Sequence, residues 1–435
     1  MNLIEDKINK IYYNFLLAAF GSAMISAIYG LVDMAMVGQY AGPQGTAALA
    51  VVSPIWNIIY SLGLLTGIGG AALFSNAKGK KDVDENQYFT VAVAATAFIS
   101  VAIWILLVVF ENKLLILFGA DEILLPIAKE YIFPIKFVIP LFLFYQMIIV
   151  FLRNDNDAAL ATWSVIGGGI LNIIGDYVFI FVLKMGVGGA GIATVIGIVI
   201  SLGICLLHFL KKKNKLKFVK TIGVFKKTTQ ICFNGFSAFF IDFAMGILTI
   251  MFNRQIMKYN STDALAVYGI INNIAAVIQC CAYAIGQASQ PIISINYGAG
   301  RSDRIKVVLN NAIVTSLIFG IISATAVMIK PNIFVYIFMK PTPEVLKIAP
   351  LIMRLYALSF VFLPLNVFST YYFQSIMKMA ASFIISVLRG IVISGILIYT
   401  LPLINPNLIW LSIPITEITV FGIVFFFIMR YIKKS

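Results

Sequence analysis

The sequence predicts an all-α polytopic membrane protein with twelve transmembrane helices. Two observations carry this prediction. The 435 residues are 61% hydrophobic and only 11% charged, with a mean hydropathy of +0.97, which is more apolar surface than a soluble protein of this size needs. In addition, about a dozen apolar blocks follow one another almost end to end, each near the ~20 residues that a helix needs to cross a bilayer.

Polar breaks between the apolar blocks delimit the expected spans. The first half contains spans at 11–38, 46–74, 87–110, 127–152, 158–183 and 188–210. The second half contains spans at 229–257, 264–294, 306–329, 348–377, 381–404 and 407–430. The start of the chain, MNLIEDKINK, is polar and mixed in charge, which is not typical of a cleavable signal. An even number of spans places both termini on one side of the membrane.

The basic residues predict which side this is. If the termini are cytoplasmic, cytoplasmic segments hold 21 of the 32 Lys and Arg residues: Lys7, Lys10, Lys78, Lys80, Lys81, Arg153, the eight lysines between 211 and 227, Arg301, Arg304, Lys306, Lys378, Arg430, Lys433 and Lys434. Few lie opposite, at Lys113, Lys184, Lys258 and in a 330–347 loop. The positive-inside rule therefore predicts cytoplasmic termini. The same rule explains the net charge of +14 without a nucleic-acid partner.

A basic stretch, KKKNKLKFVKTIGVFKKT (211–228), divides the chain almost in half. We expect a cytoplasmic connector that also attracts anionic lipid headgroups, between an N-terminal lobe at 1–210 and a C-terminal lobe at 229–435. The halves are weakly similar: ALAVVSPIWNII (48–59) matches ALAVYGIINNIA (264–275), and NAKGKKD (76–82) corresponds to NYGAGRSD (296–303). Six spans in each half make this a parallel repeat, as in several transporter folds. We expect a central cavity where two such lobes face each other.

Polar groups inside the spans are candidates for function, because a carboxylate mid-membrane costs roughly 2.5–3.5 kcal/mol even on the lenient insertion scale. Asp33 lies in the first span, with Tyr29 one turn earlier on the same face. Asn172 and Asp176 are four residues apart in span 5, and Thr194 lies in span 6. This hard-oxygen set suits a proton or a small cation such as Na⁺. The alternative is that each acid pairs separately with a structural donor, although no basic residue lies deep in spans 1, 5 or 6.

The second half carries intramembrane acids of its own, Asp242 in FFIDFAMGIL and Glu417 in IPITEITVFG. Either could bind a cationic substrate or form a second coupling site. Amide side chains accompany them and predict hydrogen bonds between helices, with a few lining the cavity: Asn272, Asn273, Gln279, Gln287, Gln290 and Gln374.

Other patterns argue against an enzyme. GVGGAG (186–191) mimics a dinucleotide fingerprint, but no soluble strand precedes it, so it favours close helix packing. No GxxxxGK[ST] motif is present, so we expect no ATP hydrolysis by this chain.

An intramembrane enzyme would need a Ser/Lys pair, a paired-Asp motif or a His cluster, whereas His208 is the one histidine. It ends a span beside a lysine run, where we expect a snorkelling or interfacial role in place of catalysis. We expect no cofactor besides a coupling ion.

Four stretches resemble the multidrug and toxic compound extrusion (MATE) family: VDMAMVGQYAGPQGTAALA (32–50), LRNDNDAALA (152–161), NIIGDYVFIFVLKMGVGGAGIAT (172–194) and QPIISINYGAG (290–300). The likeness covers essentially the whole chain, in order, and is greatest for the bacterial DinF-type branch. Two cytoplasmic turns depart from the family. RNDNDAA lacks the glycine and proline of the usual RNDGNP-like turn, and QSIMKMAAS is less polar than the usual glycine-lysine turn.

The resemblance implies two six-helix lobes around a V-shaped cavity, exporting substrates in exchange for Na⁺ or H⁺. In the DinF-type branch the cation site lies in the N-terminal lobe, and the matching residues are Asp33, Tyr29, Asn172, Asp176 and Thr194. Asp242 falls where relatives often have an acid in span 7, and Glu417 resembles the acid of span 12.

Together these features predict a cation-coupled antiporter of the bacterial cytoplasmic membrane that works as a monomer and exports amphipathic organic cations. The coupling ion, Na⁺ or H⁺, stays open. The alternative is a lipid-linked oligosaccharide flippase of the same superfamily. Such a flippase would be expected to carry basic residues deep in its cavity to bind pyrophosphate. The buried charges here are mostly acidic, with Arg354 and Arg389 as exceptions.

Overall fold

The computed structural model describes residues 3–80, 84–338 and 341–432, which form helices joined by short turns and by one extended connector, without a strand in these ranges. Twelve helices of the described residues are long and apolar enough to cross a membrane. They coincide with the twelve predicted spans, so the predicted fold class is confirmed. Lys81, Lys433, Lys434 and the end of the 76–82 turn, which were assigned to the cytoplasmic side, lie outside the described residues.

The chain divides into two compact units, here called unit 1 and unit 2. Unit 1 comprises Leu17–Phe239, and unit 2 combines Asn2–Leu16 with Phe240–Ser435. The start of the chain is bound within unit 2, where the Tyr12 hydroxyl lies 3.2 Å from Thr315 Oγ1. The first helix and the seventh therefore each contribute to both units, whereas the predicted lobes, 1–210 and 229–435, divide the chain at the connector.

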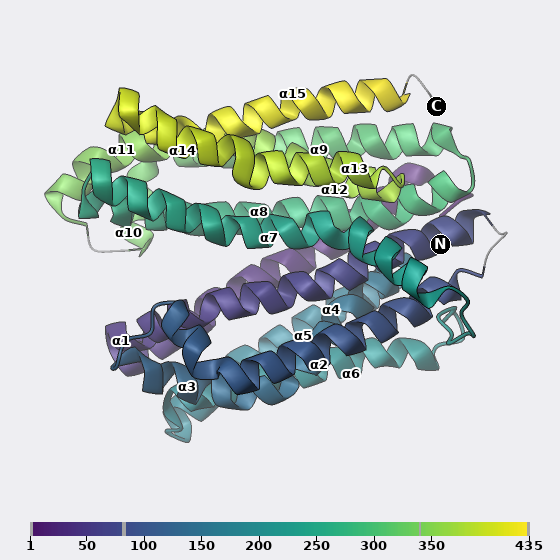
Figure 1. Cartoon of the computed structure of the whole chain (residues 1–435), viewed down its shortest axis with the longest axis horizontal. Coiled ribbons are helices and arrows are strands. Elements are labelled where there is room, and N and C mark those ends of the chain that lie inside the picture. The colour runs from purple at the N-terminus through teal and green to yellow at the C-terminus, as the bar shows by residue number, and fades with distance from the viewer. Residues whose placement is uncertain (1–2, 81–83, 339–340, 433–435) are drawn as a thin grey trace. The chain divides into compact units, whose positions relative to one another are not determined.

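Unit 1 begins in the long helix α1 (Ile8–Lys80), which is interrupted at Gly42 with φ 65° and ψ −153° (Figure 1). Glycine adopts this left-handed conformation without a steric penalty. The interruption divides α1 into two membrane-length helices, Ile8–Gly42 and Gln44–Lys80. The unit continues through α2 (Asn86–Leu117), α3 (Leu124–Ile135), the 3-10 helix η1 (Lys136–Val138), α4 (Ile139–Asn154), α5 (Ala158–Asp176), the π-helix η2 (Tyr177–Val182), α6 (Gly186–Leu206) and the 3-10 helix η3 (Leu207–Leu210).

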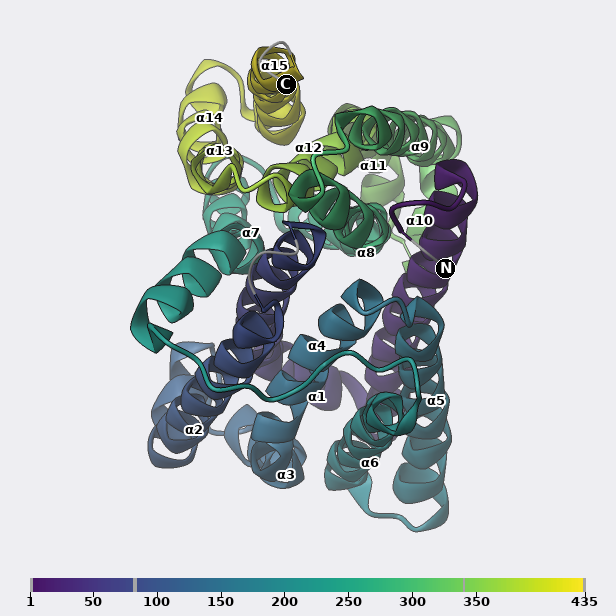
Figure 2. The same ribbon diagram turned by 90° about the vertical axis from the view of Figure 1, so that its right-hand side faces the viewer.

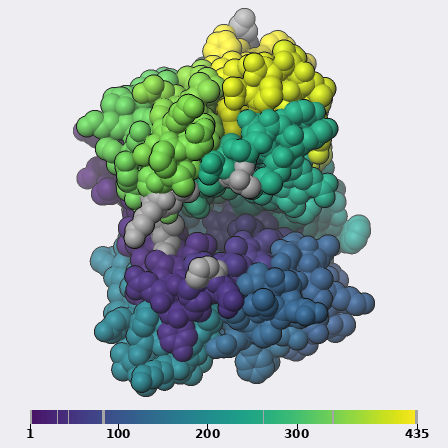
Figure 3. All heavy atoms as spheres, turned by 90° about the vertical axis from the view of Figure 1, so that its left-hand side faces the viewer, coloured from purple at the N-terminus to yellow at the C-terminus, as the bar shows by residue number. Residues whose placement is uncertain are grey.

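Unit 2 receives the end of α7 (Val224–Tyr259) and continues through α8 (Thr262–Gly298), α9 (Ser302–Ile329), α10 (Pro331–Phe338), α11 (Pro343–Ala357), α12 (Ser359–Ser375), α13 (Met379–Val387), the π-helix η4 (Leu388–Val392), α14 (Ile393–Ile404), the 3-10 helix η5 (Pro406–Leu411) and α15 (Ser412–Ile432). The side chains of Ser261 and Thr342 accept backbone N–H groups at the starts of α8 and α11. Such caps satisfy donors that a helix start leaves free. The short helix α10 and the start of α11 lie at the end of unit 2 that Figure 3 shows in green.

The same backbone turn recurs in the two halves of the chain. Asn156 and Met377 both adopt positive φ, at 68° and 57°. The next residue closes the turn in each case, with Asp157 N to Leu152 O and Lys378 N to Phe373 O both at 2.8 Å. Each turn joins the fourth span of its half to the fifth, and each fifth span contains a π-helix. This geometry supports an internal repeat.

The connector between the halves crosses one end of unit 1 as an extended segment (Figure 2). Its backbone is held by side chains of α2 and of the α4–α5 turn. Lys215 N donates to Asp155 Oδ2 and Lys217 N donates to Asn86 Oδ1, both at 2.8 Å, and Val219 N donates to the Thr90 hydroxyl at 3.1 Å. The connector is therefore part of the fold of unit 1.

His208, at the end of α6, lies beside this connector and is completely buried. Its Nε2 and Nδ1 atoms are each 2.9 Å from a carboxylate, of Asp155 and Asp157 respectively. Lys78 pairs with Asp155 at 3.0 Å, and Lys211 pairs with Asp157 at 2.8 Å. The prediction of a snorkelling His208 is wrong, because the RNDNDAA turn supplies two aspartates that hold it inside the protein, whereas the alternative of an interfacial role stays a prediction.

Candidate cation and substrate site

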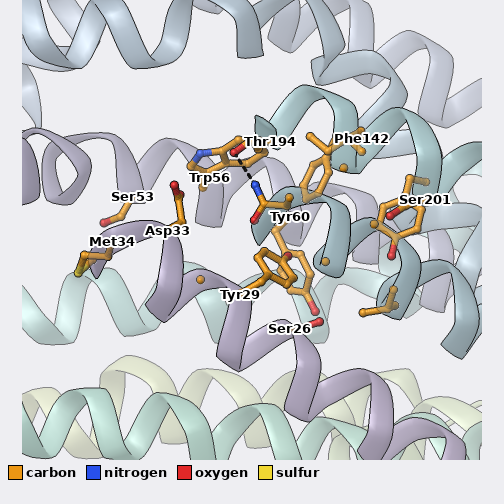
Figure 4. Close-up of a pocket in the computed structure, with 18 of the residues that line it drawn as sticks. Ser26, Tyr29, Asp33, Met34, Ser53, Trp56, Tyr60, Phe142, Thr194 and Ser201 are labelled. Carbon is orange, nitrogen blue, oxygen red and sulfur yellow. Dashed lines mark hydrogen bonds between the residues drawn. The ribbon is translucent and has the colours of Figure 1, made fainter. Parts of the chain in front are cut away.

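A cavity of about 360 Å³ lies within unit 1, between α1, α3, α4, α5 and α6. Asp33, Tyr29, Asn172 and Thr194 line it, as do the aromatic residues Trp56, Tyr60, Tyr131, Phe142 and Tyr145. In Figure 4, Asp33 from α1 and Thr194 from α6 face the same space. Unit 1 thus brings four of the five predicted cation-site residues to one cavity.

Asp33 reaches this cavity from α1, two turns before the interruption at Gly42. Its Oδ2 atom accepts a hydrogen bond from the Tyr131 hydroxyl at 2.9 Å. Its Oδ1 atom is buried and has no hydrogen-bond partner among the described residues. One carboxylate oxygen is therefore oriented by the protein and the other is left for a further ligand.

Helices α5 and α6 supply the other oxygens. The Asn172 amide nitrogen donates to Thr194 Oγ1 at 3.4 Å, drawn as the dashed line in Figure 4. Asp176, the last residue of α5, is completely buried directly before the π-helix η2 and is not among the residues that line the cavity. The Asn172 carbonyl oxygen and both Asp176 oxygens have no hydrogen-bond partner within the described part of the chain. Buried polar atoms normally have partners, so these oxygens suit a proton or a cation.

The electrostatics of the cavity are those of an acidic site. The carboxylates of Asp33 and Asp176 are close enough to repel each other, and Tyr131 interacts with both. None of the described residues that line the cavity is basic. Two like charges in a medium of low dielectric constant favour uptake of a positive ion or a proton.

Glycines allow these helices to come close enough. A methyl group on Gly168 of α5 would overlap Ser201 Oγ and the Gly197 carbonyl oxygen of α6. A methyl group on Gly191 would overlap the backbone of Tyr131, so the close approach of α6 to α3 places Tyr131 beside Asp33. The GVGGAG stretch (186–191) therefore serves helix packing, as its sequence context predicts.

Tyr131 is a site residue that the sequence analysis missed. It joins Asp33 to the α5–α6 side of the cavity, whereas Tyr29 packs its ring against Gly169 of α5. Tyrosine is common near the ends of spans, so nothing in its local sequence distinguishes Tyr131.

The predicted cavity residues of the second half lie in unit 2. Its two acids, Asp242 and Glu417, each have hydrogen-bond partners of their own. Asp242 accepts a hydrogen bond from the Tyr283 hydroxyl at 2.6 Å. Glu417 is almost fully buried and accepts from Arg389 Nε at 2.7 Å and from the Asn366 amide at 2.6 Å. These partners neutralise Glu417 inside the unit.

Among the predicted amides, Gln279 joins this network, with its carbonyl oxygen 3.3 Å from Arg389 Nη2. Asn272 and Gln287 lie half-buried on the same helix, α8. Their assignment to a substrate cavity stays a prediction, and so does the role of each residue in the unit 1 cavity.

Comparisons with known proteins agree with this architecture. A family model described as MatE matches residues 18–178 and 236–400. The probable multidrug resistance protein YoeA of Bacillus subtilis (strain 168) is 22% identical over 315 residues, covering 70% of this chain and 68% of that protein. The multidrug export protein MepA of Staphylococcus aureus (strain MSSA476) is 21% identical over 397 residues, covering 90% of this chain and 87% of its own.

Solved structures share the fold over nearly the full length. An outward-facing multidrug resistance MATE family transporter of the MOP superfamily superposes with a TM-score of 0.91 at 20% identity, covering 100% of this chain and 98% of that one. A MOP superfamily transporter from Pyrococcus furiosus, described as having a binding pocket of reverse polarity that suggests a different function, gives 0.88 at 18% identity and covers 98% and 97%. At these identities the likeness establishes the fold alone.

Proposed function

Because the chain belongs to the MATE family of multi-pass transporters in bacterial membranes, we propose that it is a secondary active exporter that exchanges amphipathic organic cations for Na⁺ or H⁺. The family resemblance of the sequence is confirmed, while its DinF-type branch stays a prediction. A transporter moves its cargo by conformational exchange, and the proposal includes no enzymatic step and no bound cofactor.

One observation carries the proposal. Within unit 1, four buried oxygens from Asp33, Asn172 and Asp176 have no partner among the described residues, and none of the described residues that line the cavity of Asp33 and Asn172 is basic. A chain that maintained two buried carboxylates only for structure would pair them with donors, because an uncompensated buried charge is costly. A cation that binds reversibly compensates the charge of these carboxylates only while it is bound.

The charge of the unit 1 acids differs between the ion-bound and the ion-free protein, and this difference couples ion movement to export. In the proposed cycle the outward-facing state takes up Na⁺ or H⁺ at Asp33 and Asp176, which removes their repulsion and favours release of the exported substrate. The inward-facing state discharges the ion to the cytoplasm and binds new substrate. A ligand shifts a conformational equilibrium only by its differential affinity for the two states, so the ion can influence the cycle only as far as its affinity differs between them.

The cavity lining supports an aromatic cation as cargo. Trp56, Tyr60 and Phe142 offer flat apolar faces beside the carboxylate of Asp33. Aromatic faces attract organic cations through their quadrupoles. The curated relatives are named as multidrug resistance and multidrug export proteins, which agrees with a broad substrate class.

Efflux from proteoliposomes tests the proposal. The purified full chain is reconstituted, ethidium is loaded, and a Na⁺ gradient or a pH gradient is imposed separately. We expect one gradient to accelerate ethidium transport, which also identifies the coupling ion. Ethidium movement that responds to neither gradient would refute cation-coupled export.

The same liposomes test the flippase alternative. A fluorescent lipid-linked oligosaccharide in the inner leaflet should become accessible no faster than in protein-free liposomes. The ion pair of Arg389 with Glu417 supports this expectation, because it engages the arginine in place of a pyrophosphate group. Fast oligosaccharide flipping without gradient-driven ethidium transport would favour the flippase.

A further inference from the structure

A second cavity, of about 410 Å³, lies at one end of unit 2. Four membrane helices meet there, since α8 ends at Gly298, α9 begins at Ser302, α12 ends at Ser375 and α15 ends at Ile432. Figure 2 looks onto this end of the unit. A cavity among span ends lies at the level where a bilayer places its phosphate groups.

The described lining of this cavity is basic and aromatic. Lys306 and Lys378 line it together with Tyr297, Tyr372 and Tyr431, and no acidic residue does. Among the described residues, neither lysine forms an ion pair. Lys378 Nζ instead lies 5.2 Å from the centre of the Tyr431 ring.

Charged neighbours outside the lining do not cancel the lysines. Asp303, on the first turn of α9, is bound by Arg301, with two contacts at 3.1 and 3.2 Å. Arg304 donates to the backbone oxygens of Leu3 and Asp6, at 3.1 and 2.8 Å. The cavity thus keeps two uncompensated positive charges.

From this lining we infer that the cavity binds a phosphate group carried on an apolar body, the headgroup of an anionic phospholipid. The two ammonium groups supply charge-assisted donors for phosphate oxygens, and tyrosine hydroxyls can donate further hydrogen bonds. Ile305, Leu309 and Ile376 give the same cavity an apolar part that suits the glycerol and the first acyl carbons. A free phosphate would use only the polar part. The inference depends on unit 2 alone, not on the proposed transport cycle.

Native mass spectrometry of the purified full chain tests the inference. Phosphatidylglycerol is titrated against wild type, a Lys306→Gln/Lys378→Gln variant, and a control variant, Lys330→Gln/Lys347→Gln. The control removes the same charge from two exposed lysines of unit 2 that do not line the cavity and lie outside the connector. We expect the cavity variant to lose at least about tenfold in affinity for the lipid and the control to lose less than about twofold. Phosphatidylcholine should bind the wild type more weakly than phosphatidylglycerol.

Three outcomes would overturn all or part of the inference. Equal losses in the two variants would mean that net charge attracts the lipid, without a specific cavity. Unchanged binding in the cavity variant would exclude the cavity as a lipid site. If inorganic phosphate binds the wild type alone and displaces phosphatidylglycerol, the phosphate site stands but its ligand is the free anion. A melting curve of each variant, equal to wild type, verifies that the substitutions leave the fold intact.

Discussion

At the residue scale, the buried acids of the two units differ in whether a basic side chain compensates their negative charge. Glu417 pairs with Arg389 at 2.7 Å, and the same arginine acts electrostatically on Asp242. The carboxylates of Asp33 and Asp176 repel each other, and none of the described residues that line the cavity of Asp33 is basic. A mobile cation gains most where protein charge is uncompensated, which is why we assign coupling to the unit 1 acids.

Removal of the Tyr131 hydroxyl tests the assignment of ion coupling to the unit 1 acids. A hydrogen bond to a charged group contributes roughly 1.5–3 kcal/mol, and ~1.4 kcal/mol is a factor of ten. In Tyr131→Phe, Asp33 loses the hydrogen bond that stabilises its charged carboxylate in the absence of the ion, so a bound ion compensates more of that charge. We therefore expect the ion concentration for half-maximal ethidium transport to fall about tenfold.

Tyr283→Phe is the matched control, because Tyr283 donates to Asp242 as Tyr131 donates to Asp33. It should leave the half-saturating ion concentration within about twofold of wild type. If both variants changed the ion dependence equally, coupling could not be assigned to unit 1.

The sequence allows some of these residues to be predicted and not others. Asp33, Asn172 and Asp176 are conspicuous because polar groups are rare in apolar spans. Tyr131 is one of 19 tyrosines. Its contact with Asp33 joins positions 98 residues apart, and that contact depends on how α6 packs against α3.

At the element scale, the close contact of α5 and α6 sets the distance between Asn172 and Thr194. Gly168→Ala would place a methyl group against Ser201 Oγ and the Gly197 carbonyl oxygen. Overpacking of this kind costs typically about 1–3 kcal/mol. We expect a lower melting temperature and weaker ion-driven transport.

Gly203→Ala on α6 is the control, because nothing lies within 4 Å of its added methyl group. It should melt at or slightly above the wild-type temperature, since alanine favours helix over glycine by about 1 kcal/mol. If Gly168→Ala and Gly203→Ala had the same melting temperature, α5 and α6 could move apart around the added methyl group without a loss of stability, which would contradict the argument.

The His208 cluster connects the end of α6 to the α4–α5 turn. Both ring nitrogens face carboxylate oxygens, so both must donate, which requires the protonated ring. His208→Ala would leave Asp155 and Asp157 buried with less compensation, and breaking a buried pair costs about 3–5 kcal/mol. We expect a lower melting temperature and faster proteolysis in the connector.

Lys213→Ala is the control for this substitution. Its ammonium lies 3.7 Å from Asp157 with the side chain 63% exposed, and exposed pairs contribute at most about 1 kcal/mol. Unchanged proteolysis in His208→Ala would contradict a stabilising role of the cluster.

The same cluster predicts a response to acid. Burial opposes the charges of Asp155 and Asp157, but hydrogen bonds from His208 and from lysines outweigh it and hold the pKa of both carboxyls below the usual value. A lowered folded pKa gives a stabilisation that is complete above the ordinary aspartate pKa, about 3.9, and is lost as the pH falls through the folded value. Connector proteolysis should therefore be slow at neutral pH and accelerate in acid below about pH 4.

Asp157→Asn should weaken this acid dependence, because the amide carries no charge to titrate. Identical profiles of proteolysis rate against pH for the variant and the wild type would contradict the argument.

Hydropathy predicts where membrane helices lie but not how they are interrupted. The expected loop at 330–347 contains α10 and the start of α11. The eight residues of α10 are apolar but far too few to cross a bilayer, so a search for spans does not detect this helix. The π-helix directly after Asp176 has no sequence signal, since YVFIFV reads as ordinary apolar span.

At the scale of the whole molecule, the distribution of basic residues predicts cytoplasmic termini. Lys213→Cys and Glu122→Cys, each in a chain whose four native cysteines are replaced by alanine, test this orientation. Both positions are exposed, one in the connector and the other in the α2–α3 turn. An impermeant maleimide should label Glu122→Cys on intact cells and Lys213→Cys only after permeabilisation, and the reverse pattern would invert the topology.

The central claim is that the acids of unit 1 couple a cation to export. The most direct measurement compares gradient-driven ethidium efflux from proteoliposomes containing wild type, Asp33→Asn or Asp242→Asn. We expect Asp33→Asn to fall to the rate of protein-free liposomes and Asp242→Asn to keep its response to the coupling gradient, even where its affinity for ethidium changes. A wild-type gradient response in Asp33→Asn, with loss in Asp242→Asn, would contradict the claim and place coupling in unit 2.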